Sequence, residues 1–164
     1  MLHTPVQQSW IAYRKNQGQR PRLRLFCIAY AGGSASAYRN WHKFLPGVDV
    51  CPIQLPGREN RLQEQVFTRL PQLLEPLAKG ILPLLDIPFA FFGHSMGALI
   101  SFELAHFVQS HYGYTPAHLF FSACRAPQLS RTDLPVLHHL NDKEFISGVR
   151  RLGECKKRSY KIRK

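Results

Sequence analysis

Residues 88–108 read PFAFFGHSMGALISFELAHFV, and this stretch decides the fold class. The compact apolar run over residues 88–92 predicts a strand, and apolar residues at helical spacing after residue 95 predict a helix. Between them lies the pentapeptide Gly93-His94-Ser95-Met96-Gly97. A bare Gly-x-Ser-x-Gly match is a weak signal. With a strand before it and a helix after it, the pattern is typical of a sharp turn that presents a serine hydroxyl.

Apolar runs and helical patterns alternate along the chain around this stretch. The expected strands are continuous apolar runs, which favours a mostly parallel sheet with helices on both faces and therefore the α/β class. Pro76 and Pro83 are expected to kink or end their helix, and Asn141 with Glu144 forms a capping box. The expected strands cover residues 23–30, 48–53, 88–92 and 117–123, and the expected helices cover 36–45, 70–85, 96–108 and 141–152.

The composition indicates one globular domain. The chain has 164 residues, of which 45% are hydrophobic and 20% charged, so general disorder is not expected. The start lacks a continuous apolar region, and the longest apolar stretch, residues 80–92, is too short to cross a bilayer. The cysteines form no CxxC pair, and Cys27, Cys51 and Cys124 lie in apolar runs where buried reduced thiols are expected. We expect a soluble cytoplasmic protein without a metal site.

The charge is strongly basic, with a formal net charge of +12. Six Lys or Arg and one Glu lie within residues 154–164, a basic tail that we expect to be solvated. A basic balance favours acidic partners such as nucleic acid, an anionic membrane or an acidic carrier protein. No nucleic-acid motif and no membrane segment supports the first two, so neither specific nucleic-acid binding nor membrane binding is expected.

The chemistry is expected at Ser95. A serine hydroxyl needs a base to become a nucleophile, and its reaction builds an oxyanion that needs hydrogen-bond donors. One donor would be the main-chain N–H of Met96, and another would come from the loop at residues 31–33. Gly93 and Gly97 would be required because neighbouring backbone passes too close for a Cβ. The alternatives are an ordinary serine in a strand-to-helix turn and a plain turn at residues 31–33.

Three motifs together resemble the type II thioesterases, the stand-alone α/β hydrolases that serve polyketide synthases, nonribosomal peptide synthetases and fatty acid synthases. They are AGGSA at residues 31–35, LPGRENR at residues 55–61 and GHSMGA at residues 93–98. The resemblance runs from about residue 23 to residue 153, and residues 134–152 resemble the start of the family's helical lid. Ala29 stands where the family usually has proline.

The resemblance implies a reaction and a partner. Ser95 would attack the acyl thioester on the phosphopantetheine arm of an acyl or peptidyl carrier protein, while the amides of Met96 and Ala31 hold the oxyanion. The thiol would leave, water would release the acyl group, and no cofactor would be needed. Arg58 is either a site residue or a structural one. The protein is expected to be a monomer if it is soluble.

The family places its triad Asp and His beyond the lid, and the pattern is lost here after Gly153. We therefore expect an extended lead-in over residues 1–22, a partial domain over 23–153 that lacks both triad partners, and an unrelated tail over 154–164. The alternative is a divergent protein that is whole at this length. No nearby histidine is expected to replace the missing base. His94 adjoins Ser95, but the side chains of neighbouring residues in such a turn point apart. The histidines and acids considered are His94, His106, His111, His118, His138, His139, Asp133 and Asp142.

Several functions therefore stay open. The first is acyl-thioester hydrolysis, inactive or severely impaired in this chain because base and orienting acid are missing. The second is a non-catalytic remnant that docks a carrier protein. A serine esterase or lipase of the same fold is a third, and nonspecific nucleic-acid binding through the basic ends is a weaker fourth.

Overall fold

The computed structural model describes residues 10–15, 20–126, 140–141, 143–144 and 146–148. The chain divides into two compact units, residues 1–126 and 127–164, and each is treated by itself. No helix among the described residues is long and apolar enough to cross a membrane.

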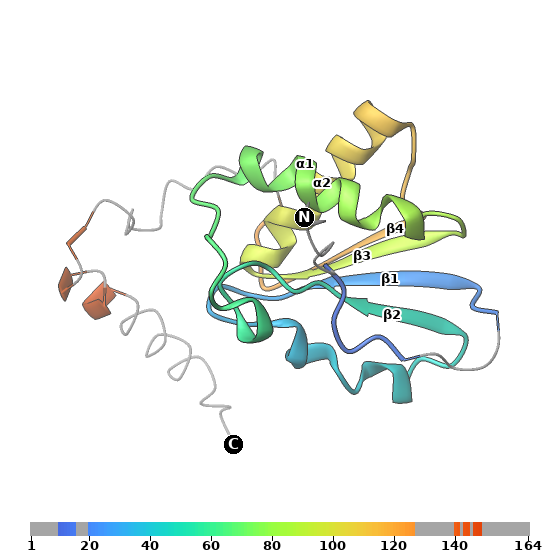
Figure 1. Ribbon diagram of the computed structural model, residues 1–164, viewed down its shortest axis with the longest axis horizontal. Coiled ribbons are helices and arrows are strands. Elements are labelled where there is room, and N and C mark those ends of the chain that lie inside the picture. The colour runs from blue at the N-terminus through green and yellow to red at the C-terminus, as the bar shows by residue number, and fades with distance from the viewer. Residues whose placement is uncertain (1–9, 16–19, 127–139, 142, 145, 149–164) are drawn as a thin grey trace, which may run out of the picture. The chain divides into compact units, whose positions relative to one another are not determined.

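The first unit is built on a parallel sheet of four strands, shown in Figure 1. All three pairings are parallel, and the strand order is β2-β1-β3-β4. The strands are β1 (Leu23–Ile28), β2 (Val48–Pro52), β3 (Phe89–His94) and β4 (His118–Ser122). Four strands, each an apolar run in the sequence, confirm the predicted α/β class with a mostly parallel sheet.

Two layers cover the sheet on its opposite faces. The helices α1 (Leu70–Ile81) and α2 (Met96–Tyr112) pack on one face, against side chains such as Phe26 and Phe91. The 3-10 turns η1 (Ala35–Tyr38) and η2 (Trp41–Lys43) cover the other face. There Trp41 packs edge-to-face on Phe92 with ring centroids 4.8 Å apart. Burial of these two apolar layers is the main stabilising term of the unit.

The helix predicted over residues 36–45 is wrong. Its aromatic residues recur every three positions, and this spacing also fits the two short 3-10 turns that the chain forms. Phe44, one of these aromatic residues, is 78% exposed. Pro76 does not end its helix, because α1 continues through it to Ile81; that it kinks the helix stays a prediction. Pro83 does end the α-helix, since it lies in the turn η4 (Leu82–Leu84) that follows.

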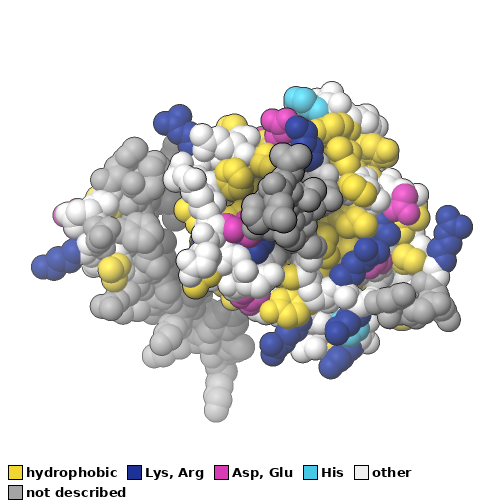
Figure 2. All heavy atoms as spheres, in the orientation of Figure 1, with side chains coloured by type: hydrophobic (Ala, Val, Ile, Leu, Met, Phe, Trp, Pro, Cys, Tyr) yellow, Lys and Arg dark blue, Asp and Glu magenta, His cyan; other side chains and the backbone are white. Residues whose placement is uncertain are grey.

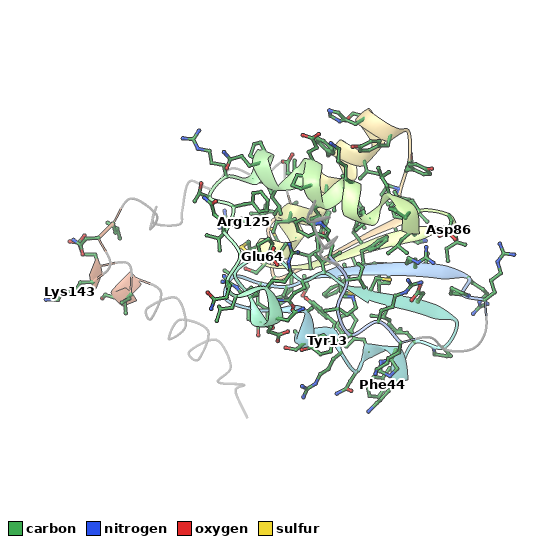
Figure 3. The ribbon with its side chains drawn as sticks, viewed as in Figure 1. Tyr13, Phe44, Glu64, Asp86, Arg125 and Lys143 are labelled. Carbon is green, nitrogen blue, oxygen red and sulfur yellow. The ribbon has the colours of Figure 1, made fainter. Side chains whose placement is uncertain are left out.

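The amino ends of the strands hold an ion-pair cluster, in which Arg24 and Asp49 are buried and Arg14 and Asp86 are exposed. Arg24 lies between the carboxylates of Asp49 and Asp86, and Arg14 donates to Asp49 at 2.7 Å. Burial alone would raise the pKa of Asp49, but hydrogen bonds from Arg14 and Arg24 outweigh it and lower the pKa. In Figure 3, Asp86 marks this end of the sheet and Glu64 lies near the opposite, carboxyl end.

The carboxyl-terminal strand forms an edge of the sheet. Within the described residues only β3 pairs with β4, so its outer edge has no partner strand there. Leu119, Phe120 and Phe121 are 38%, 47% and 37% exposed, so the strand is only partly covered, in part by Phe102 of α2, which packs edge-to-face on Phe121. An exposed apolar edge strand of this kind can pair with another chain and is an aggregation hazard.

Other segments differ in detail from the expected organisation. Residues 10–12, in the expected lead-in, lie against the end of β2: Ile11 forms an antiparallel bridge with Ile53. In the second unit, residues 143, 144 and 146–148 are helical, and the Glu144 amide donates to the Asn141 side chain at 3.1 Å. The predicted cap is therefore present, while residues 149–152 of that helix and the basic tail lie outside the described residues.

Candidate active site

The turn between β3 and α2 has the geometry of a nucleophile elbow. Ser95 is its only residue outside both elements, and its backbone adopts φ 54° and ψ −113°. A positive φ is rare for a residue other than glycine, and it is held only where the surroundings fix it. Ser95 is neither buried nor fully exposed, so its hydroxyl is not lost in the apolar core.

The two elbow glycines are required by close backbone contacts. A Cβ on Gly93 would lie 2.2 Å from the carbonyl oxygen of Gly97, and a Cβ on Gly97 would lie 2.1 Å from that of Ile28. Neither obstacle is a side chain that could rotate away. The contact at Gly97 also places the start of α2 directly against the end of β1, close to the loop at residues 31–33.

The elbow is tied to β4 by a hydrogen bond. The Ser95 amide donates to the Ser122 carbonyl oxygen at 2.8 Å, and the Ala98 amide donates to the Ser95 carbonyl oxygen at 3.0 Å. His94 Nδ1 lies 3.0 Å from Ser122 Oγ, and its ring packs edge-to-face on Tyr30. The imidazole of His94 therefore faces these two residues, in keeping with the expectation that it does not serve Ser95 as a base.

The loop at residues 31–33 is a tight turn beside the elbow. Gly32 has φ 80°, and the Gly33 amide donates to the Tyr30 carbonyl oxygen at 2.9 Å. Within the described residues the amides of Ala31 and Met96 donate to no main-chain acceptor. Met96 is also the first residue of a 17-residue helix, whose amino end carries a partial positive charge. Both amides are thus without a main-chain acceptor there, and their role as oxyanion donors stays a prediction.

The other residues of the LPGRENR motif have structural contacts. Arg58 donates to the carbonyl oxygen of its own neighbour Gly57 at 2.9 Å. Arg61 is buried. It pairs with Glu64 at 2.6 Å, and its guanidinium carbon lies 4.4 Å from the ring centre of Trp10. These contacts favour the structural reading for both arginines.

Sequence reasoning missed the residues that support the loop at residues 31–35. The side-chain oxygen of Gln54 accepts from the Ala35 amide at 3.0 Å, and Glu59 accepts from the Ser34 hydroxyl at 2.6 Å. Hydrogen bonds from Ser34 and then Ser36 lower the pKa of the Glu59 carboxyl. A glutamine after a strand resembles any loop residue, so no signal in the sequence marked it.

In the part of the chain that the structure describes, no general base lies at hydrogen-bond distance from Ser95. Among the described residues, no histidine and no carboxylate hydrogen-bonds to the Ser95 hydroxyl. His106 and His111 are exposed on α2, where the His111 ring stacks on Phe107, and His118 is exposed at the start of β4. The candidates His138, His139, Asp133 and Asp142 lie outside the described residues.

The described residues also contain no group of three His, Cys, Asp or Glu close enough to hold a metal ion. Cys27 and Cys51 are buried as predicted, whereas Cys124 is partly exposed. The expectation that the protein needs no metal or cofactor stays a prediction.

Several known proteins are similar to this chain in sequence. Residues 23–163 match the family described as thioesterase domain. Gramicidin S biosynthesis protein GrsT of Aneurinibacillus migulanus is 51% identical over 140 residues, which are 84% of this chain and 54% of GrsT. Linear gramicidin dehydrogenase LgrE of Brevibacillus parabrevis is 49% identical over 162 residues, which are 98% of this chain and 61% of LgrE.

Solved structures share the fold. The type II thioesterase BorB from the borrelidin biosynthetic cluster gives a TM-score of 0.75 at 33% identity, over 88% of this chain and 61% of BorB. The thioesterase RedJ from the prodiginine pathway of Streptomyces coelicolor gives 0.72 at 37% identity, over 86% of this chain and 53% of RedJ. The chain therefore spans 53–61% of the length of these four proteins.

Proposed function

The chain belongs to the thioesterase family, and on that premise we propose that Ser95 is the nucleophile of an acyl-thioester hydrolysis. The family membership confirms the resemblance to type II thioesterases of polyketide and nonribosomal peptide synthesis. The observation that carries the proposal is the backbone of Ser95 at φ 54°, held between two glycines that admit no side chain.

The proposed reaction has two halves. In the first, the Ser95 oxygen loses its proton and bonds to the thioester carbon, the amides of Met96 and Ala31 stabilise the oxyanion, and the carbon–sulfur bond breaks to release the thiol. In the second, water attacks the acyl-serine, the acid leaves, and Ser95 recovers its proton. The proton acceptor is not among the described residues that contact Ser95, so we expect slow turnover by this chain alone.

The proposed substrate is an acyl group on the phosphopantetheine arm of a carrier protein. Its support is the family and a net charge of +12, which favours an acidic partner. Lys and Arg side chains are spread over several parts of the face shown in Figure 2. A cytoplasmic location and a monomeric state stay predictions.

The name of one relative, linear gramicidin dehydrogenase LgrE, suggests a different reaction for that protein. A dinucleotide-binding fold carries a G-x-G-x-x-G pattern directly after its first strand. Here β1 is followed by AYAGGSA at residues 29–35, which does not match this pattern. We therefore do not propose a dehydrogenase activity for this chain.

A fluorophosphonate probe tests the proposal, because it labels an activated serine. We expect labelling of the full chain that Ser95→Ala abolishes, and faster hydrolysis of an acyl-carrier thioester than of a p-nitrophenyl ester. The reverse substrate order would favour the esterase alternative. Labelling equal to that of Ser95→Ala would reject the proposal, and carrier-protein binding under those conditions would favour the non-catalytic remnant.

A further inference from the structure

Gln54 links three separate parts of the chain from a fully buried position. It directly follows Ile53, whose amide donates to the Cys27 carbonyl oxygen of β1 at 2.8 Å. Its own amide donates to Trp10, and its main-chain oxygen accepts from Arg61 Nη1, both at 2.8 Å. The main chain of Gln54 is therefore fixed on both sides, so its 0% exposed side chain extends from a rigid base.

The side chain of Gln54 holds the segment that follows the loop at residues 31–33. Its Oε1 accepts from the Ala35 amide at 3.0 Å. Its Nε2 is buried and has no hydrogen-bond partner within the described residues, so among these residues the side-chain amide of Gln54 hydrogen-bonds to Ala35 alone. A buried main-chain N–H left without an acceptor is costly, which makes the Ala35 contact strongly preferred over its loss.

Glu59 makes a second attachment next to the first. One carboxylate oxygen accepts from the Ser34 hydroxyl at 2.6 Å, and the other accepts from the hydroxyl of Tyr13, labelled in Figure 3, at 3.0 Å. Glu59 does this from φ 44°, a left-handed conformation that side-chain-bearing residues rarely adopt. Such a conformation persists only where surrounding contacts hold it, and here those contacts reach the loop at residues 31–35.

The loop is therefore fixed at both ends. At its start Ile28 belongs to β1, and its carbonyl oxygen accepts from the Tyr38 hydroxyl at 3.1 Å. At its end Ser34 and Ala35 are held by Glu59 and Gln54. The residues between include Gly32 at φ 80°, and a glycine loses much conformational freedom when it is ordered. The two side chains oppose that loss.

We propose that Gln54 and Glu59 are positioning residues, which act through Ala35 and Ser34 to fix the amide of Ala31 relative to Ser95. The inference rests on the proposed function of Ser95, since it treats Ala31 as an oxyanion donor. A displacement of about 1 Å in a catalytic group can lower a rate about 100-fold. The hydrogen bonds of both side chains go to the loop and its neighbours and not to Ser95, so we expect the effect in the rate of the chemical step and not in substrate binding.

The test measures Ser95-dependent hydrolysis of p-nitrophenyl acetate by the full chain, with the rate of Ser95→Ala subtracted. Hydrolysis that survives without a base depends on the oxyanion donors and on binding, so it is sensitive to their placement. We expect Gln54→Met and Glu59→Ala to lower kcat about 10- to 100-fold with KM within about threefold. Glu59→Gln keeps an acceptor for Ser34 and should retain most of kcat.

A matched control removes another exposed carboxylate. Glu75 on α1 accepts from Lys79 at 2.6 Å, far along the chain from the loop, and Glu75→Ala should leave kcat unchanged. The positioning role is overturned if Gln54→Met and Glu59→Ala lose no more activity than Glu75→Ala. It is also overturned if Glu59→Gln loses as much as Glu59→Ala.

Amide hydrogen exchange gives a readout that needs no activity. We expect the hydrogen-bonded amides of Gly33 and Ala35 to exchange at least 10-fold faster in Gln54→Met and Ser34→Ala, while those of β1 keep their wild-type rates. Equal acceleration in β1 would mean general destabilisation and would overturn the inference, as would unchanged exchange at Gly33. If the wild-type chain hydrolyses no faster than Ser95→Ala, the proposed function fails, and the exchange result alone decides whether the two residues fix the loop.

Discussion

Replacing Gly97 by alanine should move the loop at residues 31–33 away from Ser95. The added Cβ would lie 2.1 Å from the Ile28 carbonyl oxygen and 2.7 Å from that of Ala29, where ordinary contact begins at 3.4 Å. Both obstacles are main-chain atoms, so the end of β1 or the start of α2 must move by more than 1 Å. Ala31, two residues beyond Ala29, would move with β1.

The cost of this movement follows from packing. Overfilling a close-packed site costs about 1–3 kcal/mol, and main-chain obstacles put Gly97→Ala at the upper end, ~3 kcal/mol. With a urea m-value of about 2 kcal/mol/M, the midpoint of unfolding should fall by about 1.5 M. A shift of about 1 Å at Ala31 should also lower Ser95-dependent hydrolysis about 100-fold.

Urea unfolding monitored by circular dichroism, together with the p-nitrophenyl acetate assay, checks both numbers. The control is Gly113→Ala, because a Cβ at Gly113 meets nothing within 4 Å and its φ of 75° costs only about 1 kcal/mol. Gly113→Ala should keep the wild-type hydrolysis rate. Equal urea midpoints for the two variants, with hydrolysis unchanged in Gly97→Ala, would refute the reasoning. Insoluble Gly97→Ala beside soluble Gly113→Ala would support it.

The remaining predictions concern the core, the ion-pair cluster and the thiols. Leu77 is fully buried on α1, and Leu77→Ala should lower the free energy of unfolding by about 2–5 kcal/mol. Leu62 is 65% exposed, and Leu62→Ala should change the free energy of unfolding by less than about 0.5 kcal/mol. Urea titration of the two variants compares these values. Folding lowers the pKa of Asp49 from 3.8, so the stability that its carboxylate contributes is present above pH 3.8 and is lost as the pH falls through the folded pKa. The urea concentration at the midpoint of unfolding should therefore decrease when the pH is lowered below about 4. The decrease should be less steep in Asp49→Asn. Burial raises the pKa values of the Cys27 and Cys51 thiols, that of Cys51 to about 12, so both should resist a thiol reagent at pH 8 until urea unfolds the protein; rapid native-state modification would contradict this.

The sequence predicts those parts of the molecule that depend on neighbouring residues. The strands end within two residues of their predicted limits because each is an apolar run between turn residues. The elbow was predictable for a similar reason, since Gly93, Ser95 and Gly97 all lie within five residues. The helix over residues 36–45 failed because the three-residue spacing of Tyr38 and Trp41 suits a 3-10 turn as well as an α-helix.

The supporting contacts of the site could not be predicted in this way. Gln54 meets Ala35 across 19 residues and Glu59 meets Ser34 across 25, so neither contact leaves a local pattern. The positive φ of Glu59 is also hidden in the sequence, because nothing in its residue type favours a left-handed backbone. Long-range side-chain contacts of this kind are decided only once the sheet has assembled.

The hydrogen bond from the Ser95 amide to the Ser122 carbonyl has a consequence for biosynthesis. The acceptor is made 27 residues after the donor, which corresponds to about 1–5 s of translation at ordinary rates. During that interval the nascent chain contains the serine and both glycines of the turn but lacks the strand that holds them. The last contact of the turn thus comes from a residue that is synthesised later. On a ribosome that stalls before residue 122, the Ser95 amide still lacks its acceptor.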